Sequence, residues 1–119
     1  MAKKILIVDD DEQIRNLCKI LVTSLGYEVR TAENGKDALE KLAGYNPDLI
    51  ITDTNMPEMD GISLCQKVRE YQEYRNTPII AVSGLDNRDA MLGAGANDYL
   101  SKPYKLDDLE EMLKQHLGG

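Results

Sequence analysis

Short apolar runs alternate with segments of helical periodicity from one end of the chain to the other. The apolar runs predict five strands, at residues 4–8, 27–31, 49–52, 78–82 and 99–100. Between and after them, apolar residues recur every three or four positions, which predicts helices. These helical positions are Ile14, Leu17, Cys18, Leu21 and Leu25; Ala38, Leu39 and Leu42; Ile62, Leu64, Cys65 and Val68; a brief segment at 87–92; and Leu106, Leu109, Met112, Leu113 and Leu117.

The first, third and fourth predicted strands are almost entirely apolar. Such strands suit the centre of a parallel sheet that is covered on both faces, whereas an antiparallel sheet would show alternation. Right-handed crossovers then favour a doubly wound α/β fold with a five-stranded parallel sheet and five helices. Ligands of such folds bind at the carboxyl ends of the strands, so the chemistry is expected there.

Composition narrows the possible functions. The 119 residues form one predicted domain, residues 1–119, too short for a separate output domain, and the formal net charge of -7 disfavours direct binding to nucleic acid or an anionic membrane. No apolar run reaches the ~18 residues needed to span a bilayer, and no signal pattern is present, so a cytoplasmic location is expected. The two cysteines, Cys18 and Cys65, have no metal-ligand spacing around them and are expected to be buried thiols.

Acidic residues follow two of the central strands. Residues 9–12 read Asp-Asp-Asp-Glu after the first strand, and Asp53 follows the third. Carboxylates that meet at one sheet edge repel each other unless a cation neutralises them, and hard oxygen ligands favour Mg²⁺. The alternative is that residues 9–12 only cap the first helix, where acidic side chains favour the positive end of the helix dipole.

Two further polar residues fall at strand ends. Lys102 follows the fifth strand, and Ser83 with Gly84 follows the fourth. A lysine in such a place is usually a solvated charge, and Ser-Gly is usually a turn. Together with Asp53, however, an ammonium and a hydroxyl are the groups needed around a phosphoryl group on a carboxylate.

At these residues the chain resembles the receiver domain of two-component response regulators, close to the single-domain members of chemotaxis type. The resemblance covers essentially the whole chain. It implies a flavodoxin-like sheet of order 2-1-3-4-5. The motifs that carry it are Ile7-Val8-Asp9-Asp10, residues 52–61 (TDTNMPEMDG), Ser83-Gly84 and residues 94–104 (AGANDYLSKPY).

The resemblance implies that Asp53 is the phosphoacceptor in a phosphorelay. It implies a Mg²⁺ site with Asp10 and Asp53 as direct ligands, Asp9 as a ligand through water, and Asn55 as a ligand through its backbone carbonyl. The phosphoryl donor would be a histidine kinase or a phosphotransfer protein, and the output would go to a downstream protein target. The domain would act as a monomer or as a phosphorylation-dependent dimer.

The family also implies a switch. Ser83 and Lys102 would contact the phosphoryl oxygens, and Tyr99 would turn into the space that Ser83 leaves. The Lys102-Pro103 bond is expected to be cis. The surface of the fourth helix, fifth strand and fifth helix would then change shape. The alternative for Tyr99 is an ordinary strand tyrosine with its hydroxyl at the surface.

Three features depart from the family pattern. The segment between Ser83 and Tyr99 is about three residues shorter than in typical relatives, about one helical turn, so the fourth helix is expected to be short. Serine at 83 replaces the commoner threonine. Lys105 stands where a capping residue would serve the fifth helix better, which the sequence does not explain.

Two other functions compete with this interpretation. Phosphatases of the haloacid dehalogenase type also form an aspartyl phosphate, but they use a second aspartate two residues on, where this chain has Asn55. A carboxamide cannot shuttle the proton, so an enzyme is disfavoured. A docking module that never accepts phosphate is the other rival. The chain is also compatible with a receiver domain cut from a longer regulator or hybrid kinase.

Overall fold

The computed structural model describes residues 2–54, 56, 59–84 and 87–118. Its strands are β1 (Lys4–Val8), β2 (Glu28–Ala32), β3 (Leu49–Asp53), β4 (Ile79–Ser83) and β5 (Asp98–Ser101). Its helices are α1 (Glu12–Ser24), α2 (Gly35–Tyr45), α3 (Gly61–Glu70), α4 (Arg88–Ala94) and α5 (Leu106–Leu117), with a 3₁₀ turn, η1 (Gln72–Tyr74), after α3. The predicted alternation of strands and helices is confirmed.

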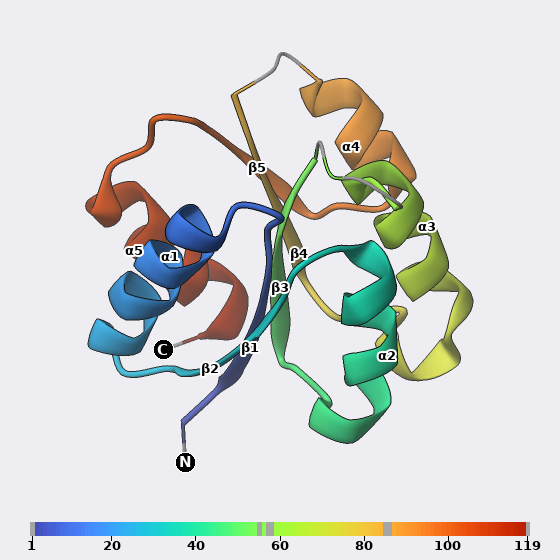
Figure 1. Cartoon of the computed structure of the whole chain (residues 1–119), viewed down its shortest axis with the longest axis horizontal. Helices are drawn as coiled ribbons and strands as arrows, with labels where there is room; N and C mark the ends of the chain where they lie inside the picture. The colour runs from blue at the N-terminus through green and yellow to red at the C-terminus, as the bar shows by residue number, and fades with distance from the viewer. Residues whose placement is uncertain (1, 55, 57–58, 85–86, 119) are drawn as a thin grey trace.

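All strand pairs are parallel, and the strand order is β2-β1-β3-β4-β5, as the receiver fold implied. The apolar runs occupy the three central positions, and every residue of β4 is buried. In Figure 1 the sheet lies between a layer formed by α1 and α5 and a layer formed by α2, α3 and α4. The doubly wound α/β fold is therefore confirmed.

Each layer encloses its own core because successive strand residues point to opposite faces of the sheet. Ile5, Ile7 and Ile51 face α1 and α5, whereas Leu6 and Ile50 face the other three helices. The cysteines separate in the same way: Cys18 belongs to the first core and Cys65 to the second. Both are buried free thiols, as expected.

Polar side chains cap the amino-terminal ends of α1, α2 and α3. Asp11 accepts hydrogen bonds from the backbone N–H groups of Gln13 and Ile14 at the start of α1, and Asn34 and Asp60 cap α2 and α3 in the same manner. Lys105 gives α5 no side-chain cap. Aspartates 107 and 108 lie in its first turn instead, where they favour the positive end of the helix dipole.

The fourth helix is short, as predicted. It has 7 residues and ends at Gly95, whose φ of 119° places it in the left-handed region that glycine adopts without strain. An added Cβ at Gly95 would also lie 2.9 Å from the Cγ of Arg69. The short helix is thus held closely against α3 at its carboxyl end.

Among the residues described, no helix is both long enough and apolar enough to cross a membrane.

Candidate functional site

The polar residues that the sequence placed at strand ends come together at the carboxyl edge of the sheet. Asp9 follows β1, Asp53 ends β3, Ser83 ends β4 and Lys102 follows β5. The strand register explains the grouping, because Asp53 pairs with Val82 and Ser83 pairs with Ser101 across adjacent parallel strands. Parallel strands that end at the same level bring residues far apart in sequence to one edge.

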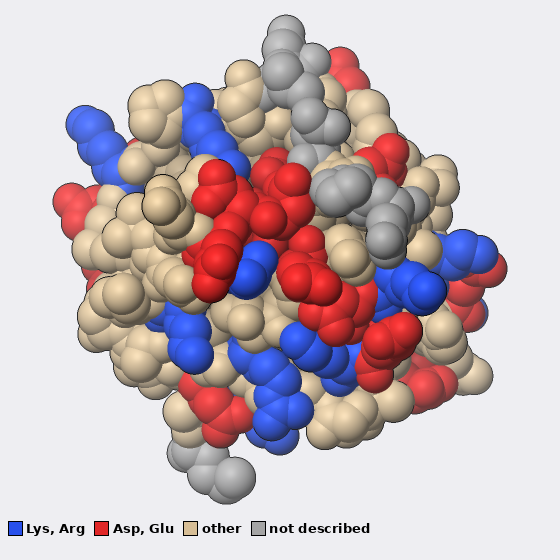
Figure 2. All heavy atoms as spheres, viewed as in Figure 1, with Lys and Arg blue, Asp and Glu red and all other residues tan. Residues whose placement is uncertain are grey.

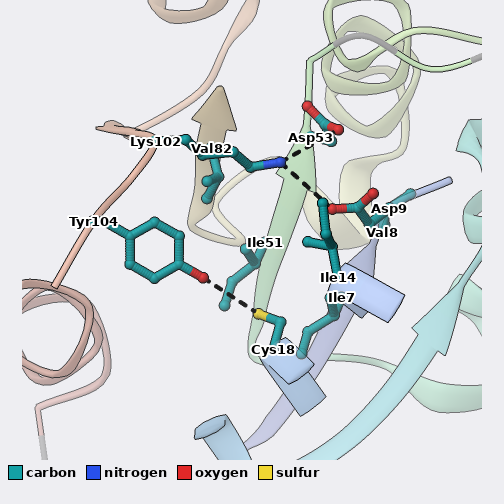
Figure 3. A pocket seen from close by; sticks show the side chains of 10 residues that line it. All are labelled: Ile7, Val8, Asp9, Ile14, Cys18, Ile51, Asp53, Val82, Lys102 and Tyr104. Carbon is teal, nitrogen blue, oxygen red and sulfur yellow. Dashed lines mark hydrogen bonds and ion pairs between the residues drawn. The ribbon is translucent and has the colours of Figure 1, made fainter. Parts of the chain in front are cut away.

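Lys102 lies between two carboxylates. Its Nζ is 3.6 Å from Oδ2 of Asp53 and 3.7 Å from Oδ2 of Asp9 (Figure 3). The lysine side chain comes from the loop after β5 and reaches across the edge of the sheet toward β1 and β3. An ammonium in this place attracts anionic oxygen atoms near Asp53 as well as the carboxylates themselves.

A third carboxylate completes the acidic group. One oxygen from each of Asp9, Asp10 and Asp53 lies within 4.8 Å of the others. Asp9 is buried, Asp53 is half-buried and Asp10 is exposed, so the group opens to solvent on one side. Figure 2 shows acidic side chains gathered across the middle of the face seen there, with lysine and arginine side chains beside them.

Burial raises the pKa of Asp9 above its ordinary value, and the nearby charges of Asp53 and Asp10 raise it further. The hydrogen bond from the Asp11 backbone and the charge of Lys102 oppose this rise without cancelling it. The carboxylate form of Asp9 is therefore costly in the protein alone. A divalent cation among these oxygen atoms would remove that cost, and carboxylate oxygens suit Mg²⁺.

The acidic stretch serves two purposes, one for each hypothesis made from the sequence. Asp11 caps α1, whereas Asp9 and Asp10 lie with Asp53. The cap also orders the site, since the Asp11 N–H donates to Oδ1 of Asp9 at 2.9 Å. Arg15 Nη1 donates to the Asp9 carbonyl at 2.9 Å, so the first turns of α1 hold the end of β1 in place.

Ser83 is almost fully buried, and its hydroxyl accepts a hydrogen bond from Thr54 Oγ1 at 2.7 Å. Thr54 is also buried, and its backbone N–H donates to Oδ1 of Asp53 at 2.7 Å. The sequence alone did not indicate a role for Thr54. A hydroxyl residue directly after the aspartate of β3, level with the serine that ends β4, was the signal available.

Tyr99 is buried in the core below α4, and its hydroxyl donates to Oδ1 of Asn87 at 3.1 Å. Asn87 is the residue that precedes α4. The ring is therefore part of the core, and the hydroxyl has a hydrogen-bond partner in the protein. The contact joins the middle of β5 to the start of α4, two elements that the family resemblance assigned to the switch surface.

The floor of the site is apolar and neutral. The pocket under the carboxylates is lined by β-strand side chains, including Ile7 and Ile51, and by Cys18 and Tyr104 (Figure 3). The Tyr104 hydroxyl lies 3.9 Å from Cys18 Sγ, and burial raises the pKa of both groups. This floor adds no charge, so the electrostatics of the site are set by its carboxylates and Lys102.

Two remaining expectations concern the loops. The Lys102-Pro103 bond is cis, as expected. Asn55, expected to offer its backbone carbonyl to the metal, lies outside the residues that the structure describes.

Comparison with known proteins agrees with this geometry. Residues 5–114 match the model of the response regulator receiver domain. The chain is 37% identical over 112 residues to the response regulator MprA of Mycolicibacterium vanbaalenii, which covers 92% of this chain and 48% of the relative. The chain therefore belongs to the response regulator receiver domain family, which is a family of signalling domains and not of classical enzymes. It spans about half the length of the curated relatives it matches.

Solved receiver structures share the fold closely. The receiver domain of the sensor histidine kinase PA1611 of Pseudomonas aeruginosa, solved with a magnesium ion in its active-site cleft, superposes with a TM-score of 0.92, 32% identity and 100% of each chain covered. The response regulator TrrA of Thermotoga maritima, solved with Mg²⁺ and BeF, gives a TM-score of 0.88, 35% identity and coverage of 96% and 98% of the two chains.

Proposed function

We propose that residues 1–119 act as a cytoplasmic receiver unit in which Asp53 accepts a phosphoryl group from a phosphohistidine on a histidine kinase or phosphotransfer protein. The observation that carries this proposal is the position of Lys102, whose ammonium lies 3.6 Å from Asp53 and 3.7 Å from Asp9. An isolated lysine would face water. Here it lies where negative charge would develop on the transferred oxygens.

In the transfer, a carboxylate oxygen of Asp53 forms a bond to phosphorus while the bond from phosphorus to the donor nitrogen breaks. The imidazole leaves with the electron pair of that bond and takes a proton. Lys102 would stabilise charge on the phosphoryl oxygens, and the Ser83 hydroxyl would donate to one of them. The backbone N–H of Thr54 fixes the orientation of the Asp53 carboxylate at 2.7 Å.

Asp9, Asp10 and Asp53 would hold Mg²⁺, with Asp10 and Asp53 as direct ligands, Asp9 through water and the Asn55 carbonyl as a further ligand. The bound ion would neutralise charge on the carboxylates and on the phosphoryl oxygens. The proposal is supported by the three carboxylates within 4.8 Å of one another and by the pKa of Asp9, which burial and the neighbouring carboxylates raise.

Acetyl phosphate with Mg²⁺ tests this proposal directly. We expect stoichiometric phosphorylation, measured as added mass on the intact protein, that disappears in Asp53→Asn and in the presence of EDTA. Asp60→Asn, which alters an exposed helix cap, is the matched control and should still be phosphorylated. Failure of the wild-type protein to gain mass would instead favour the docking module that never accepts phosphate.

The phosphodonor would dock on α1 and the loop after β5, beside Arg15 and Asn16. Next to the site, a groove of about 390 Å³ is lined mostly by apolar side chains of α1 and this loop, including Leu17, Leu21 and Pro103. Leu17 is 57% exposed and Ile20 is 65% exposed, which is unusual for large apolar side chains on one helix face. An apolar helix face beside a phosphoacceptor suits a helical protein partner.

Leu17→Arg should lower the rate of phosphotransfer from a histidine kinase by at least about ten-fold, since it places a charge in the apolar contact. The rate with acetyl phosphate should not change, because that donor needs no docking surface. Tyr71, which is 47% exposed at the end of α3, provides the control Tyr71→Arg. An equal loss with both donors would show damage to the site and contradict the docking proposal.

The output would pass through Ser83 and Tyr99 to the surface formed by α4, β5 and α5, which would contact a downstream protein target as a monomer or a phosphorylation-dependent dimer. The contact between the Tyr99 hydroxyl and Asn87 supports this route, because movement of the ring would release the residue that precedes α4. A complex with Mg²⁺ and beryllofluoride in which Tyr99 and Ser83 keep these positions would exclude it.

A further inference from the structure

Thr54 contacts both polar groups that the proposed function requires to respond to phosphorylation. Its backbone N–H donates to Asp53 Oδ1 at 2.7 Å, and its hydroxyl donates to Ser83 Oγ at 2.7 Å. Both hydroxyl side chains are buried, with 4% of Thr54 and 1% of Ser83 exposed. A short hydrogen bond in a buried place is costly to break unless the donor finds another acceptor.

The strand pattern shows why Ser83 must move if it is to reach a phosphoryl group. Asp53 and Val82 pair across β3 and β4, and both line the pocket on the α1 side of the sheet. Thr54 directly follows β3 and Ser83 is the last residue of β4, each one residue after this pair, and successive side chains point to opposite faces. Two residues before Ser83, Ala81 belongs to the core under α2, α3 and α4. The Ser83 hydroxyl therefore meets Thr54 on the side of the sheet away from the Asp53 pocket.

We propose that Thr54 is a positioning residue whose hydroxyl holds Ser83 in the unphosphorylated orientation. The hydrogen bond thereby shifts the equilibrium between the two orientations of Ser83 toward the unphosphorylated one. This inference rests on the proposed function of Asp53 and Ser83. When Ser83 turns to a phosphoryl oxygen, the Thr54 hydroxyl loses its acceptor inside the protein. The Thr54–Ser83 bond therefore stabilises only the unphosphorylated orientation, and a typical net hydrogen bond corresponds to about five-fold in an equilibrium constant.

Beryllofluoride with Mg²⁺, followed by amide NMR spectra, measures the effect on binding without any phosphodonor. Thr54→Val keeps the shape of the side chain and removes the hydroxyl, so we expect about five-fold tighter binding than in the wild type. Thr54→Ser keeps the hydroxyl and should restore the wild-type affinity. In the Ser83→Ala background, Thr54→Val should bring no gain, because the contact is already absent.

Thr52→Val is the matched control. Thr52 is a buried threonine of β3, two residues before Thr54, and its hydroxyl donates to the Asp53 carbonyl oxygen at 2.9 Å rather than to Ser83. This variant should bind beryllofluoride no more tightly than the wild type. Unchanged or weaker binding by Thr54→Val, or the same gain with Ser83→Ala, would overturn the role of Thr54.

A second measurement needs no variant. In a crystal structure of the wild type with Mg²⁺ and beryllofluoride, Ser83 Oγ should lie within hydrogen-bond distance of a fluoride and beyond it from Thr54 Oγ1. A Thr54–Ser83 bond that persists in this complex would overturn the inference. Absence of beryllofluoride binding by the wild type would count against the proposed function itself, and so the two failures are distinct.

Discussion

Arg69 and Asp9 are both charged side chains that are at least partly buried, but their surroundings differ. The Arg69 guanidinium donates to the carbonyl oxygens of Gly95, Tyr74 and Thr77 and to Oδ1 of Asn97, at 2.7 to 3.1 Å. Every acceptor in this set is neutral. Burial lowers the pKa of Arg69, but the carbonyl dipoles surround the charge on all of its nitrogen atoms.

At the carboxyl edge of the sheet, the charged side chains have other charges as neighbours and not only neutral groups. Three carboxylates lie within 4.8 Å of one another, and the Lys102 ammonium contacts Asp9 and Asp53 at more than 3.5 Å. The cation that joins α3, η1 and the end of α4 is satisfied by the fold, whereas the acidic group sets like charges side by side. The comparison teaches that a structural charge is surrounded by neutral hydrogen-bond acceptors from the chain, whereas like charges held side by side are typical of a site that binds a ligand or an ion.

The largest expected effect on stability comes from removing the Arg69 charge, which tests its structural role. Arg69→Met keeps the aliphatic stem but removes the donor to the carbonyls of Gly95 and Thr77, while the Tyr74 carbonyl keeps its hydrogen bond from the Thr77 N–H. We expect the free energy of unfolding in urea to fall by about 3 kcal/mol, since each buried acceptor that loses its partner costs about 1–3 kcal/mol and these costs are only partly additive.

Arg75→Met is the control, because Arg75 is exposed at the end of η1. Its effect should stay within about 0.5 kcal/mol. A loss below about 1 kcal/mol for Arg69→Met would show that solvent replaces the missing donors and that the hydrogen-bond set around Arg69 is of little structural importance.

Removal of a charge from the acidic group should raise the free energy of unfolding, whereas removal of the Arg69 charge lowers it. Asp9→Asn keeps an oxygen that accepts from the Asp11 N–H and removes a carboxylate whose pKa is raised by burial and by its acidic neighbours. In EDTA we expect the variant to be about 1 kcal/mol more stable than the wild type in urea unfolding. With Mg²⁺ the wild type should gain stability and the advantage of the variant should shrink or reverse.

Glu40→Gln serves as the control for the loss of one negative charge from an exposed position on α2. It should change stability by no more than about 0.5 kcal/mol, with or without Mg²⁺. Destabilisation by Asp9→Asn in EDTA would mean that attraction to Lys102 exceeds the cost of burial and repulsion, and the contrast with Arg69 would fail.

The two regions also differ in how well the sequence predicted them. The parallel doubly wound sheet and the meeting of Asp9, Asp53, Ser83 and Lys102 followed from apolar runs and from the rule that ligands bind at the carboxyl ends of parallel strands, whereas the strand order followed from the family resemblance. Arg69 gave no such signal. Its acceptors at Gly95 and Asn97 lie 26 and 28 residues away in the chain, and only the packing of α3 against the end of α4 brings them together.

The side-chain contacts within the site could not be predicted from the sequence either. The stretch of residues 9–12 was open to two interpretations, and the backbone geometry at the start of α1 divided it between cap and acidic group. The Thr54–Ser83 bond depends on strand register to one residue, which the apolar pattern does not fix. The missing side-chain cap at Lys105 still has no physical explanation.

The last prediction concerns Cys65, which sharpens the comparison because it lies near the Arg69 charge. A neighbouring cation lowers a thiol pKa, yet burial outweighs it here and raises the pKa of Cys65 from 9.0 to about 11. A raised folded pKa means that the stability from this group is present below about pH 9 and lost as the pH rises through about 11. At pH 8 the shift alone lowers the thiolate fraction about 100-fold. Alkylation by iodoacetamide, followed by peptide mapping, should therefore be at least about 100-fold slower at Cys65 in the folded protein than in urea. Rapid alkylation of folded protein at this residue would show that the charge of Arg69 outweighs burial at Cys65 and that the neutral acceptors around Arg69 do not contain its effect on its neighbours.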